Sequence, residues 1–208
     1  RMRIPDLPAD LIHRAADGDL ASMDALLRAI EGGIFNLAVR MLGHREDAAD
    51  ASQEILLKVT THLGGYRGEA AFSTWVYRIA RNHLSNAATR MPEAPTVSLE
   101  AIGEKLEQGL GFGRAHAPEF DAGALRPEDK AEAVEVAVGC TQGMLMALDR
   151  DQRLAYLLDV VFGLPSEQAG EVLGIAPAAF RKRLSRARER LDGFMRRACG
   201  LVDAGAAC

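Results

Sequence analysis

The sequence predicts an all-α protein with two small helical domains. Apolar residues recur at helical spacing along most of the 208 residues, and no segment shows the alternation of a convincing β-strand. The periodicity lapses between residues 92 and 127, where prolines, glycines and acidic side chains gather as in a linker. An apolar content of 48% can supply a core on each side of this segment. We therefore expect one domain over residues 9–91, a long acidic linker over 92–127, a second domain over 128–198 and a C-terminal tail over 199–208.

The first domain opens with helical spacing over residues 9–42. We expect breaks at Gly18-Asp19 and at Gly32-Gly33, because glycine destabilises the interior of a helix. This pattern predicts two helices and the start of a helical hairpin. Two longer helices follow over residues 47–63 and 72–89, and a loop separates them.

The predicted helix over residues 47–63 has two distinct faces. One face is apolar and consists of Ala48, Ala51, Ile55, Val59 and Leu63. The adjacent face is acidic and includes a leucine; it consists of Asp47, Asp50, Gln53, Glu54 and Leu57. A solvated surface explains the acidic face equally well, but an exposed leucine among acids also suits docking onto a basic helical partner.

The predicted helix over residues 72–89 combines an apolar stripe with basic residues. The stripe consists of Phe72, Trp75, Val76, Ile79 and His83. We interpret Trp75 as a core residue and His83 as a buried histidine of the same stripe. Arg78, Arg81 and Asn82 lie elsewhere on the helix, and residues 64–91 hold four bases against one acid. Such a surface suits single-stranded or partly melted DNA.

The net charge of −4 is distributed unevenly along the chain. Residues 177–197 hold eight Arg or Lys against two acids, a balance of +6, so the rest of the chain carries −10. Residues 92–135 hold ten acids against four bases, or −6, and we expect only a short helix within them, near residues 99–106. This segregation indicates separate surfaces for separate partners.

The second domain is expected to hold helices over residues 128–148, 151–162, 166–173 and 177–198. The last two have the layout of a helix-turn-helix. Gly174 can adopt the left-handed turn, Ile175 can fill the angle between the helices, and Pro177 suits a first helical turn.

The final helix carries an apolar stripe and a basic remainder. The stripe consists of Phe180, Leu184, Ala187 and Leu191. Arg181, Lys182 and Arg183 fall in the first turns, where a recognition helix reaches base edges; Arg186, Arg188 and Arg190 are better placed for phosphates. A solvated basic face is the alternative, but it explains the charges and not the glycine turn or the proline.

Two stretches resemble a known family. Residues 9–90, with Asp50-x-x-Gln53-Glu54, Tyr66-Arg67-Gly68 and the run from Phe72 to Asn82, resemble region 2 of extracytoplasmic-function (group 4, sigma-70 family) sigma factors. Residues 144–195 resemble region 4. The resemblance implies a sigma factor that binds core RNA polymerase through its β′ and β subunits and directs promoter-specific initiation. It implies no catalysis and no cofactor, and it makes an anti-sigma factor a further candidate partner.

The resemblance also implies residue roles. The residues that would contact the polymerase are Asp47, Asp50, Gln53, Glu54 and Leu57. Those that would bind the −10 element are Tyr66, Arg67, Arg78, Arg81 and Asn82, with the loop over residues 64–71 capturing a flipped base. Those that would bind the −35 element are Ala178, Arg181, Lys182, Arg183 and Arg186. Leu148-Asp149 and the run from Ala179 to Arg183 depart from the usual family pattern, so the promoter preference does not transfer.

Rival functions account for less of the sequence. A regulator that binds duplex DNA as a dimer, without polymerase, explains the helix-turn-helix but leaves the acidic face and the basic helix of the first domain unexplained. An enzyme is disfavoured because the five histidines lack metal-ligand spacing and no phosphate loop or nucleophile elbow is present.

The cysteines and the hydropathy indicate a protein of the cytoplasm. Cys140, Cys199 and Cys208 are too few for a disulfide framework, and Cys199 with Cys208 forms only a weak candidate metal site because zinc requires about four ligands. No apolar run reaches the length of about 20 residues that spans a bilayer, and no signal-peptide pattern is present, so we expect no membrane insertion.

Overall fold

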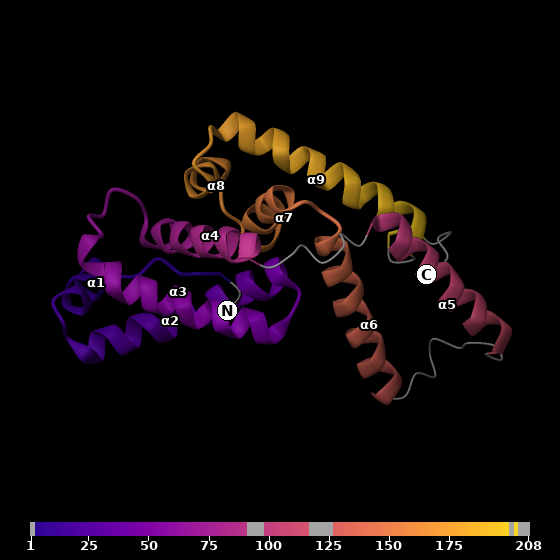
Figure 1. Cartoon of the computed structure of the whole chain (residues 1–208), viewed down its shortest axis with the longest axis horizontal. Helices are drawn as coiled ribbons and strands as arrows, with labels where there is room; N and C mark the ends of the chain where they lie inside the picture. The colour runs from indigo at the N-terminus through magenta and orange to yellow at the C-terminus, as the bar shows by residue number, and fades with distance from the viewer. Residues whose placement is uncertain (1–2, 91–97, 117–126, 200–201, 204–208) are drawn as a thin grey trace.

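The structure is a computed structural model that describes residues 3–90, 98–116, 127–199 and 202–203. Within these ranges every regular element is a helix, which confirms the all-α prediction. Figure 1 shows a bundle of long N-terminal helices, a group of C-terminal helices stacked on one side of it, and two helices that each touch these parts at one end and project away from them at the other.

The N-terminal bundle begins at α1 and ends with α4. Its elements are α1 (Ala9–Ala16), α2 (Leu20–Leu42), α3 (Arg45–His62), the 3-10 turn η1 (Leu63–Gly65) and α4 (Phe72–Arg90). The carboxylate of Asp19 accepts a hydrogen bond from the backbone N–H of Ser22 and so caps α2. At the other end of α2, Gly43 adopts the left-handed conformation with φ +84°, which favours glycine.

The break predicted at Gly32-Gly33 is wrong, because α2 runs through both residues. Gly33 is needed for close packing: a Cβ there would lie 2.7 Å from Ile4 Cγ1 and 2.8 Å from Ile4 N. Ile4 is fully buried, and its N–H donates to the hydroxyl of Tyr77 over 3.2 Å. The chain before α1 is therefore fixed against α2 and α4.

The C-terminal part contains five α-helices in its described ranges. They are α5 (Leu99–His116), α6 (Pro127–Met146), α7 (Arg150–Tyr156), α8 (Ser166–Leu173) and α9 (Pro177–Ala198), with a π-helical segment, η3 (Leu157–Val161), after α7. The predicted helix over residues 151–162 thus changes its hydrogen-bond pattern midway. The short helix expected at residues 99–106 is in fact the 18-residue α5.

The helix α5 packs against the C-terminal group. Leu99, Ile102 and Leu106 contact a cluster formed by Ala147, Leu148, Ala187, Leu191 and Phe194. A Cβ on Gly103 would lie 3.6 Å from the Phe194 ring, an ordinary contact distance, so α5 and α9 are close neighbours. Part of the segment expected to be a linker therefore contributes to a core.

The N-terminal bundle and the C-terminal group share one apolar core. The rings of Tyr77 in α4 and Phe162 after η3 lie 5.7 Å apart, and both are buried. The buried guanidinium of Arg153 donates to four backbone carbonyls, those of Met41, Leu145, Met146 and Leu148. It thereby joins the end of α2 to the end of α6, and α8 packs against α4 (Figure 1).

Candidate polymerase and nucleic-acid interface

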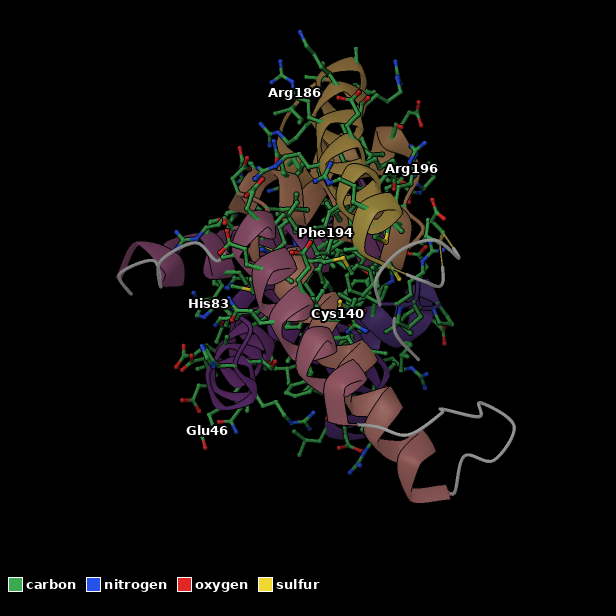
Figure 2. The ribbon with its side chains drawn as sticks, turned by 90° about the vertical axis from the view of Figure 1, so that its right-hand side faces the viewer. Glu46, His83, Cys140, Arg186, Phe194 and Arg196 are labelled. Carbon is green, nitrogen blue, oxygen red and sulfur yellow. The ribbon has the colours of Figure 1, made fainter. Side chains whose placement is uncertain are left out.

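The acidic face of α3 lies on the surface. Asp50, Gln53 and Glu54 are exposed, Asp47 is half-buried, and Leu57 keeps 58% of its surface accessible. All five residues predicted for the adjacent apolar face are buried. Figure 2 shows this edge of the molecule, with Glu46 of the first turn of α3 pointing outward. The helix thus presents an accessible leucine among acids and anchors itself entirely through its other face.

An aromatic cluster organises the loop between α3 and α4. The Tyr66 hydroxyl donates to the carbonyl of Ala70 over 2.8 Å. The Tyr66 ring lies edge-on to Phe72, with centroids 5.5 Å apart, and 5.4 Å from Trp75. Burial raises the pKa of the Tyr66 phenol, with a smaller contribution from the nearby Asp6 carboxylate. The Tyr66 side chain therefore fixes the conformation of the loop.

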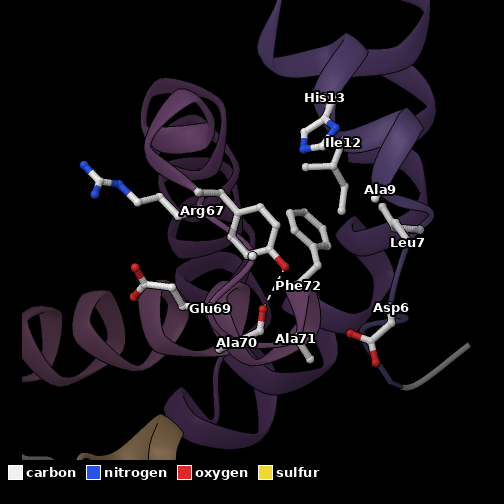
Figure 3. Close-up of a pocket in the computed structure, with 12 residues that line it drawn as sticks. Asp6, Leu7, Ala9, Ile12, His13, Arg67, Glu69, Ala70, Ala71 and Phe72 are labelled. Atoms are coloured by element: carbon white, nitrogen blue, oxygen red, sulfur yellow. Dashed lines mark hydrogen bonds between the residues drawn. The ribbon is translucent and has the colours of Figure 1, made fainter.

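One pocket lies between this loop and the start of the chain (Figure 3). We call it the N-terminal pocket; its volume is about 580 Å³ and its lining includes Asp6, His13, Arg67, Glu69 and Phe72. Asp6 also accepts a hydrogen bond from the backbone N–H of Ser73, at 3.0 Å, and so holds the first turn of α4. Figure 3 shows Arg67 and Glu69 extending away from the Phe72 ring.

A second pocket lies between α3 and α4, and we call it the α3–α4 pocket. Its volume is about 380 Å³, and its lining residues are Lys58, His62, Gly65, Trp75, Ile79, Asn82 and His83. Lys58 Nζ donates to His83 Nδ1 over 2.8 Å. The pocket therefore combines cationic and polar side chains at its edge with the faces of Trp75 and Ile79.

The interpretation of Trp75 and His83 as core residues is wrong, because both are only half-buried. The buried side of α4 instead consists of Phe72, Ser73, Thr74, Val76, Tyr77, Ala80 and Leu84. Tyr77, which the predicted stripe omits, faces Ile4 and Phe162. The chain start and the C-terminal group both pack on α4 at Tyr77. The buried face of the helix therefore includes Tyr77, and Trp75 lies at its edge.

The basic residues of α4 have different surroundings. Arg78 Nη2 lies 3.2 Å from Glu171 Oε1 of α8, and Arg78 Nε donates to the Glu171 carbonyl over 3.2 Å. Arg81 Nη1 donates to Asn82 Oδ1 over 2.9 Å. The structure therefore groups Arg81 and Asn82 beside the α3–α4 pocket, whereas Arg78 is directed toward the C-terminal group.

The helix-turn-helix forms as the sequence predicts. Gly174 adopts the left-handed conformation with φ +67°, and the N–H of Ile175 donates to the carbonyl of Gly170 over 3.0 Å. A Cβ on Gly170 would lie 2.8 Å from the Ile175 carbonyl oxygen, so this position needs glycine. Sequence reasoning missed Gly170, although a glycine inside a short helix signals close backbone approach.

The basic surface of α9 divides into exposed and engaged residues. Ala178, Arg181, Lys182 and Arg186 are exposed, and Figure 2 shows Arg186 pointing away from the molecule. Arg183 lies 3.0 Å from Asp151 Oδ2 and is partly covered. Two of the three arginines that spacing placed near phosphates pair within the domain: Arg188 contacts Asp159 at 2.6 Å, and Arg190 donates to Gln152 at 3.1 Å.

No metal centre emerges in the described part of the chain. Cys140 and Cys199 are half-buried and form no disulfide there, while Cys208 lies outside the described residues. Across those residues no three His, Cys, Asp or Glu side chains are grouped so that they could hold a metal ion. In the same ranges no helix combines the length and the apolar character needed to cross a membrane.

Comparison with known families defines the class. Residues 26–90 match the model for Sigma-70 region 2, and residues 139–191 match that for Sigma-70, region 4. The RNA polymerase sigma-H factor of Pseudomonas aeruginosa is 32% identical over 186 residues, spanning 88% of this chain and 90% of its own. The ECF RNA polymerase sigma-E factor of Escherichia coli K12 is 28% identical over 189 residues, spanning 88% and 91%.

Solved structures share the fold. CnrH, in complex with the cytosolic domain of CnrY, superposes with a TM-score of 0.61 at 20% identity, covering 95% of this chain and 97% of its own. The sigma factor RpoE of Bartonella quintana, in complex with the anti-sigma factor NepR, gives 0.56 at 19% identity, covering 85% and 98%.

These findings define a transcription initiation factor of the sigma-70 type. The chain belongs to the sigma-70 family of RNA polymerase sigma factors, and its relatives place it among the extracytoplasmic-function members. It directs promoter-specific transcription together with core RNA polymerase. The rival interpretation, a regulator without polymerase, does not account for the region 2 match.

Proposed function

We propose that this sigma factor binds core polymerase through the acidic face of α3, reads the −10 element with α4 and its preceding loop, and reads the −35 element with α9. The observation that carries the proposal is that α3 presents its acidic face at the surface and, near its C-terminal end, also lines the α3–α4 pocket with Lys58 and His62. Docking would therefore bring that pocket to the DNA. The protein acts in the cytoplasm, performs no catalysis and needs no cofactor.

The docking surface is proposed to contact a basic helical segment of the β′ subunit. Asp50, Gln53 and Glu54 supply charge and hydrogen-bond acceptors, and Leu57 supplies apolar area at the centre. Exposed charges contribute mainly to the rate and specificity of association, whereas burial of a leucine contributes affinity. The combination is typical of a specific interface.

The loop over residues 64–71, with Tyr66 and Arg67, is proposed to capture a flipped −10 base, and we propose that the base enters the α3–α4 pocket, which this loop borders at Gly65, rather than the N-terminal pocket. A flipped base arrives with its phosphates, and Lys58, His62 and Asn82 provide a cationic or polar edge for them. The half-buried Trp75 offers an aromatic surface within the same pocket. The N-terminal pocket, by contrast, is lined by the acids Asp6 and Glu69 as well as by His13 and Arg67, so its charge is mixed.

The −35 surface is proposed to consist of Ala178, Arg181, Lys182, Arg183 and Arg186 at the start of α9. These residues follow the left-handed turn of the helix-turn-helix, where a recognition helix enters the major groove. Arg188 and Arg190 lie later in α9 and pair with η3 and α7, whereas Arg183 has to leave Asp151 of α7 before it can contact DNA.

Reconstituted transcription tests the whole proposal. The protein is mixed with core polymerase, and promoter-dependent transcripts are measured for wild type, Asp50→Ala, Gln53→Ala and the control Glu31→Ala, whose side chain is exposed on α2. We expect the first two substitutions to weaken core binding and the control to leave it unchanged. Dimeric binding to a palindrome with no affinity for core would overturn the proposal.

An anti-sigma factor is a further partner that we propose. The sigma factor RpoE is bound to the anti-sigma factor NepR in its structure, and CnrH is bound to the cytosolic domain of CnrY. The corresponding test is whether a protein that copurifies with this chain lowers transcription in the reconstituted assay. Excess sigma factor should then restore it.

A further inference from the structure

We propose that α5 is a detachable intramolecular ligand of an apolar surface at the C-terminal end of α9. In the structure α5 covers this surface, and once α5 leaves, the surface can receive an acidic amphipathic helix of a protein partner. The proposal goes beyond the proposed function, because it concerns neither the contacts to the promoter nor the acidic face of α3.

The surface is the smaller apolar cluster of the C-terminal group, and we call it the α9 apolar surface. Its buried residues are Ala147, Leu148, Ala187, Leu191 and Phe194, and Met144, Tyr156 and Ala198 border them. They come from the end of α6 and the turn after it, from α7 and from the second half of α9. Among the described residues, the buried members of this cluster are distinct from those of the shared core. A change at this surface can therefore leave the shared core intact.

The helix α5 covers the α9 apolar surface with one face. Leu99, Ile102 and Leu106 are spaced at i, i+3 and i+7, which places them on the same side of a helix, and all three pack against the cluster. A Cβ on Gly103 would lie 3.6 Å from the Phe194 ring, so the α5 backbone runs close to α9. Figure 1 shows α5 beginning beside the C-terminal end of α9. The contact is that of an amphipathic helix on an apolar surface.

The contacts of α5 are those of a helix that can detach. Among its described side chains, those of residues 99–108, none forms a hydrogen bond or an ion pair with another element. Leu99 is buried, but Ile102 and Leu106 are only half-buried. By contrast, the buried guanidinium of Arg153 fixes the end of α6 to the end of α2 through backbone carbonyls. The described part of α5 can therefore leave without breaking a polar contact of the shared core.

The charges near the contact favour an acidic helix. The exposed charged residues of α5 within its described side chains are Glu100, Glu104, Lys105 and Glu107. Exposed Arg196 and Arg197 lie in the last turn of α9. Opposite charges speed the association of two surfaces and are screened by salt. A partner helix with an acidic outer side should therefore approach this end of α9 readily and bind less tightly as salt is added.

The α9 apolar surface is separate from the proposed −35 surface. Phe194 follows Arg181 by about 20 Å along the axis of α9, because a helix rises about 1.5 Å per residue. A partner helix could therefore bind at the C-terminal end of α9 while the start of the same helix contacts DNA.

Binding of a synthetic copy of α5 tests the proposal with the full-length protein. The probe is a fluorescein-labelled peptide of residues 98–116, and binding is followed by fluorescence anisotropy. In the wild-type protein the resident α5 competes with the peptide, and a tethered helix has an effective concentration in the millimolar range. If the peptide binds the free surface with a Kd of about 100 μM, this competition lowers its apparent affinity by about tenfold.

Substitutions on the apolar face of α5 should expose the surface. The double variant Ile102→Glu and Leu106→Glu should bind the peptide at least about tenfold more tightly than the wild type, because its own α5 no longer competes. Gln108→Glu, which adds a glutamate at an exposed position of α5, is the matched control and should keep the wild-type affinity. A peptide that carries the same two glutamates should bind neither protein. Urea unfolding curves establish that each variant is folded.

Hydrogen exchange gives a second readout that needs no substitution in the protein. Excess peptide carrying Gly103→Ala should speed the exchange of α5 in the wild-type protein, because the resident helix is displaced. The spacing of 3.6 Å to Phe194 accommodates this alanine, and its extra methyl group distinguishes peptide fragments from protein fragments by mass. The glutamate-substituted peptide should leave the exchange of α5 unchanged.

Three results would each overturn the proposal. They are an equal or absent affinity of the peptide for the wild type and the double variant, binding of the glutamate-substituted peptide, and unchanged exchange of α5 at peptide concentrations that saturate the wild-type protein. Because these assays contain neither DNA nor polymerase, their outcome is independent of the proposed promoter contacts.

Discussion

The two proposed DNA-binding surfaces differ in how freely they can meet DNA. Arg181, Lys182 and Arg186 of α9 are exposed, whereas Arg78 of α4 is paired with Glu171 of α8. The partner of Arg78 belongs to the helix-turn-helix itself. One DNA-binding unit thus covers part of the other, and full exposure of the α4 surface requires the C-terminal group to move away from the bundle.

The largest effect is expected from a substitution in the core that the N-terminal bundle and the C-terminal group share. Phe162 is 2% exposed and packs on Tyr77, so Phe162→Ala should lower the free energy of unfolding by about 3–5 kcal/mol, measured by urea titration. Val160→Ala, at a residue that is 45% exposed, is the control and should cost less than about 0.5 kcal/mol. Equal effects would show that the two halves do not share a core.

Burial of Tyr77 in the shared core should make the stability of the protein fall at high pH. Burial raises the pKa of Tyr77 to about 12, above the unfolded value of 10. The folded protein therefore retains a proton that the unfolded chain loses, so stability falls as the pH rises from 10 to 12, by about 2–3 kcal/mol in total. Urea titrations between pH 9 and pH 12 measure the slope. Tyr77→Phe should lack this contribution, and identical slopes would contradict the burial of the phenol.

Removal of one exposed arginine tests how the accessible surface of α9 contacts DNA. Arg181→Ala should weaken binding to a −35 duplex by about 1–3 kcal/mol if the side chain reads a base. If the Arg181 side chain contacts only a phosphate, the slope of the logarithm of the binding constant against the logarithm of the salt concentration should become less steep by about 0.9. Fluorescence anisotropy across a salt series separates these cases. Arg196→Ala, in the last turn, should change neither quantity.

The covered surface of α4 should respond in the opposite direction. Glu171→Ala removes the carboxylate partner of Arg78 and leaves the bond to the backbone carbonyl, so it should strengthen single-strand binding by roughly 1.5- to 5-fold, as expected for a partly exposed ion pair. Glu167→Ala removes another exposed acid of α8 and serves as the control. An unchanged affinity in Glu171→Ala would mean that Arg78 takes no part in binding the strand.

Local signals were sufficient for the helix-turn-helix and for α3. The left-handed glycine at 174 and the proline at 177 marked the helix ends, and the apolar face of α3 was predicted residue by residue. These features depend on neighbours along the chain, so their patterns can be read directly from the sequence.

Long-range packing explains what was missed. The extended segment around Ile4 has no periodicity, yet it decides that Gly33 stays helical. The contact between Arg78 and Glu171 joins residues 93 positions apart, and no local pattern encodes it. The same packing turned α4 so that Tyr77 is buried and Trp75 is not. The surroundings of the α4 residues in the candidate site therefore required the tertiary structure.

The guanidinium of Arg153 has a consequence for protease digestion. Trypsin cleaves after arginine, and this arginine is withheld while its side chain donates to carbonyls at the ends of α2 and α6. Cleavage there requires the two halves to part, whereas the exposed arginines of α9 offer cuts that need no such separation. The delay between the first cuts and the cut at Arg153 would therefore time the opening of the molecule.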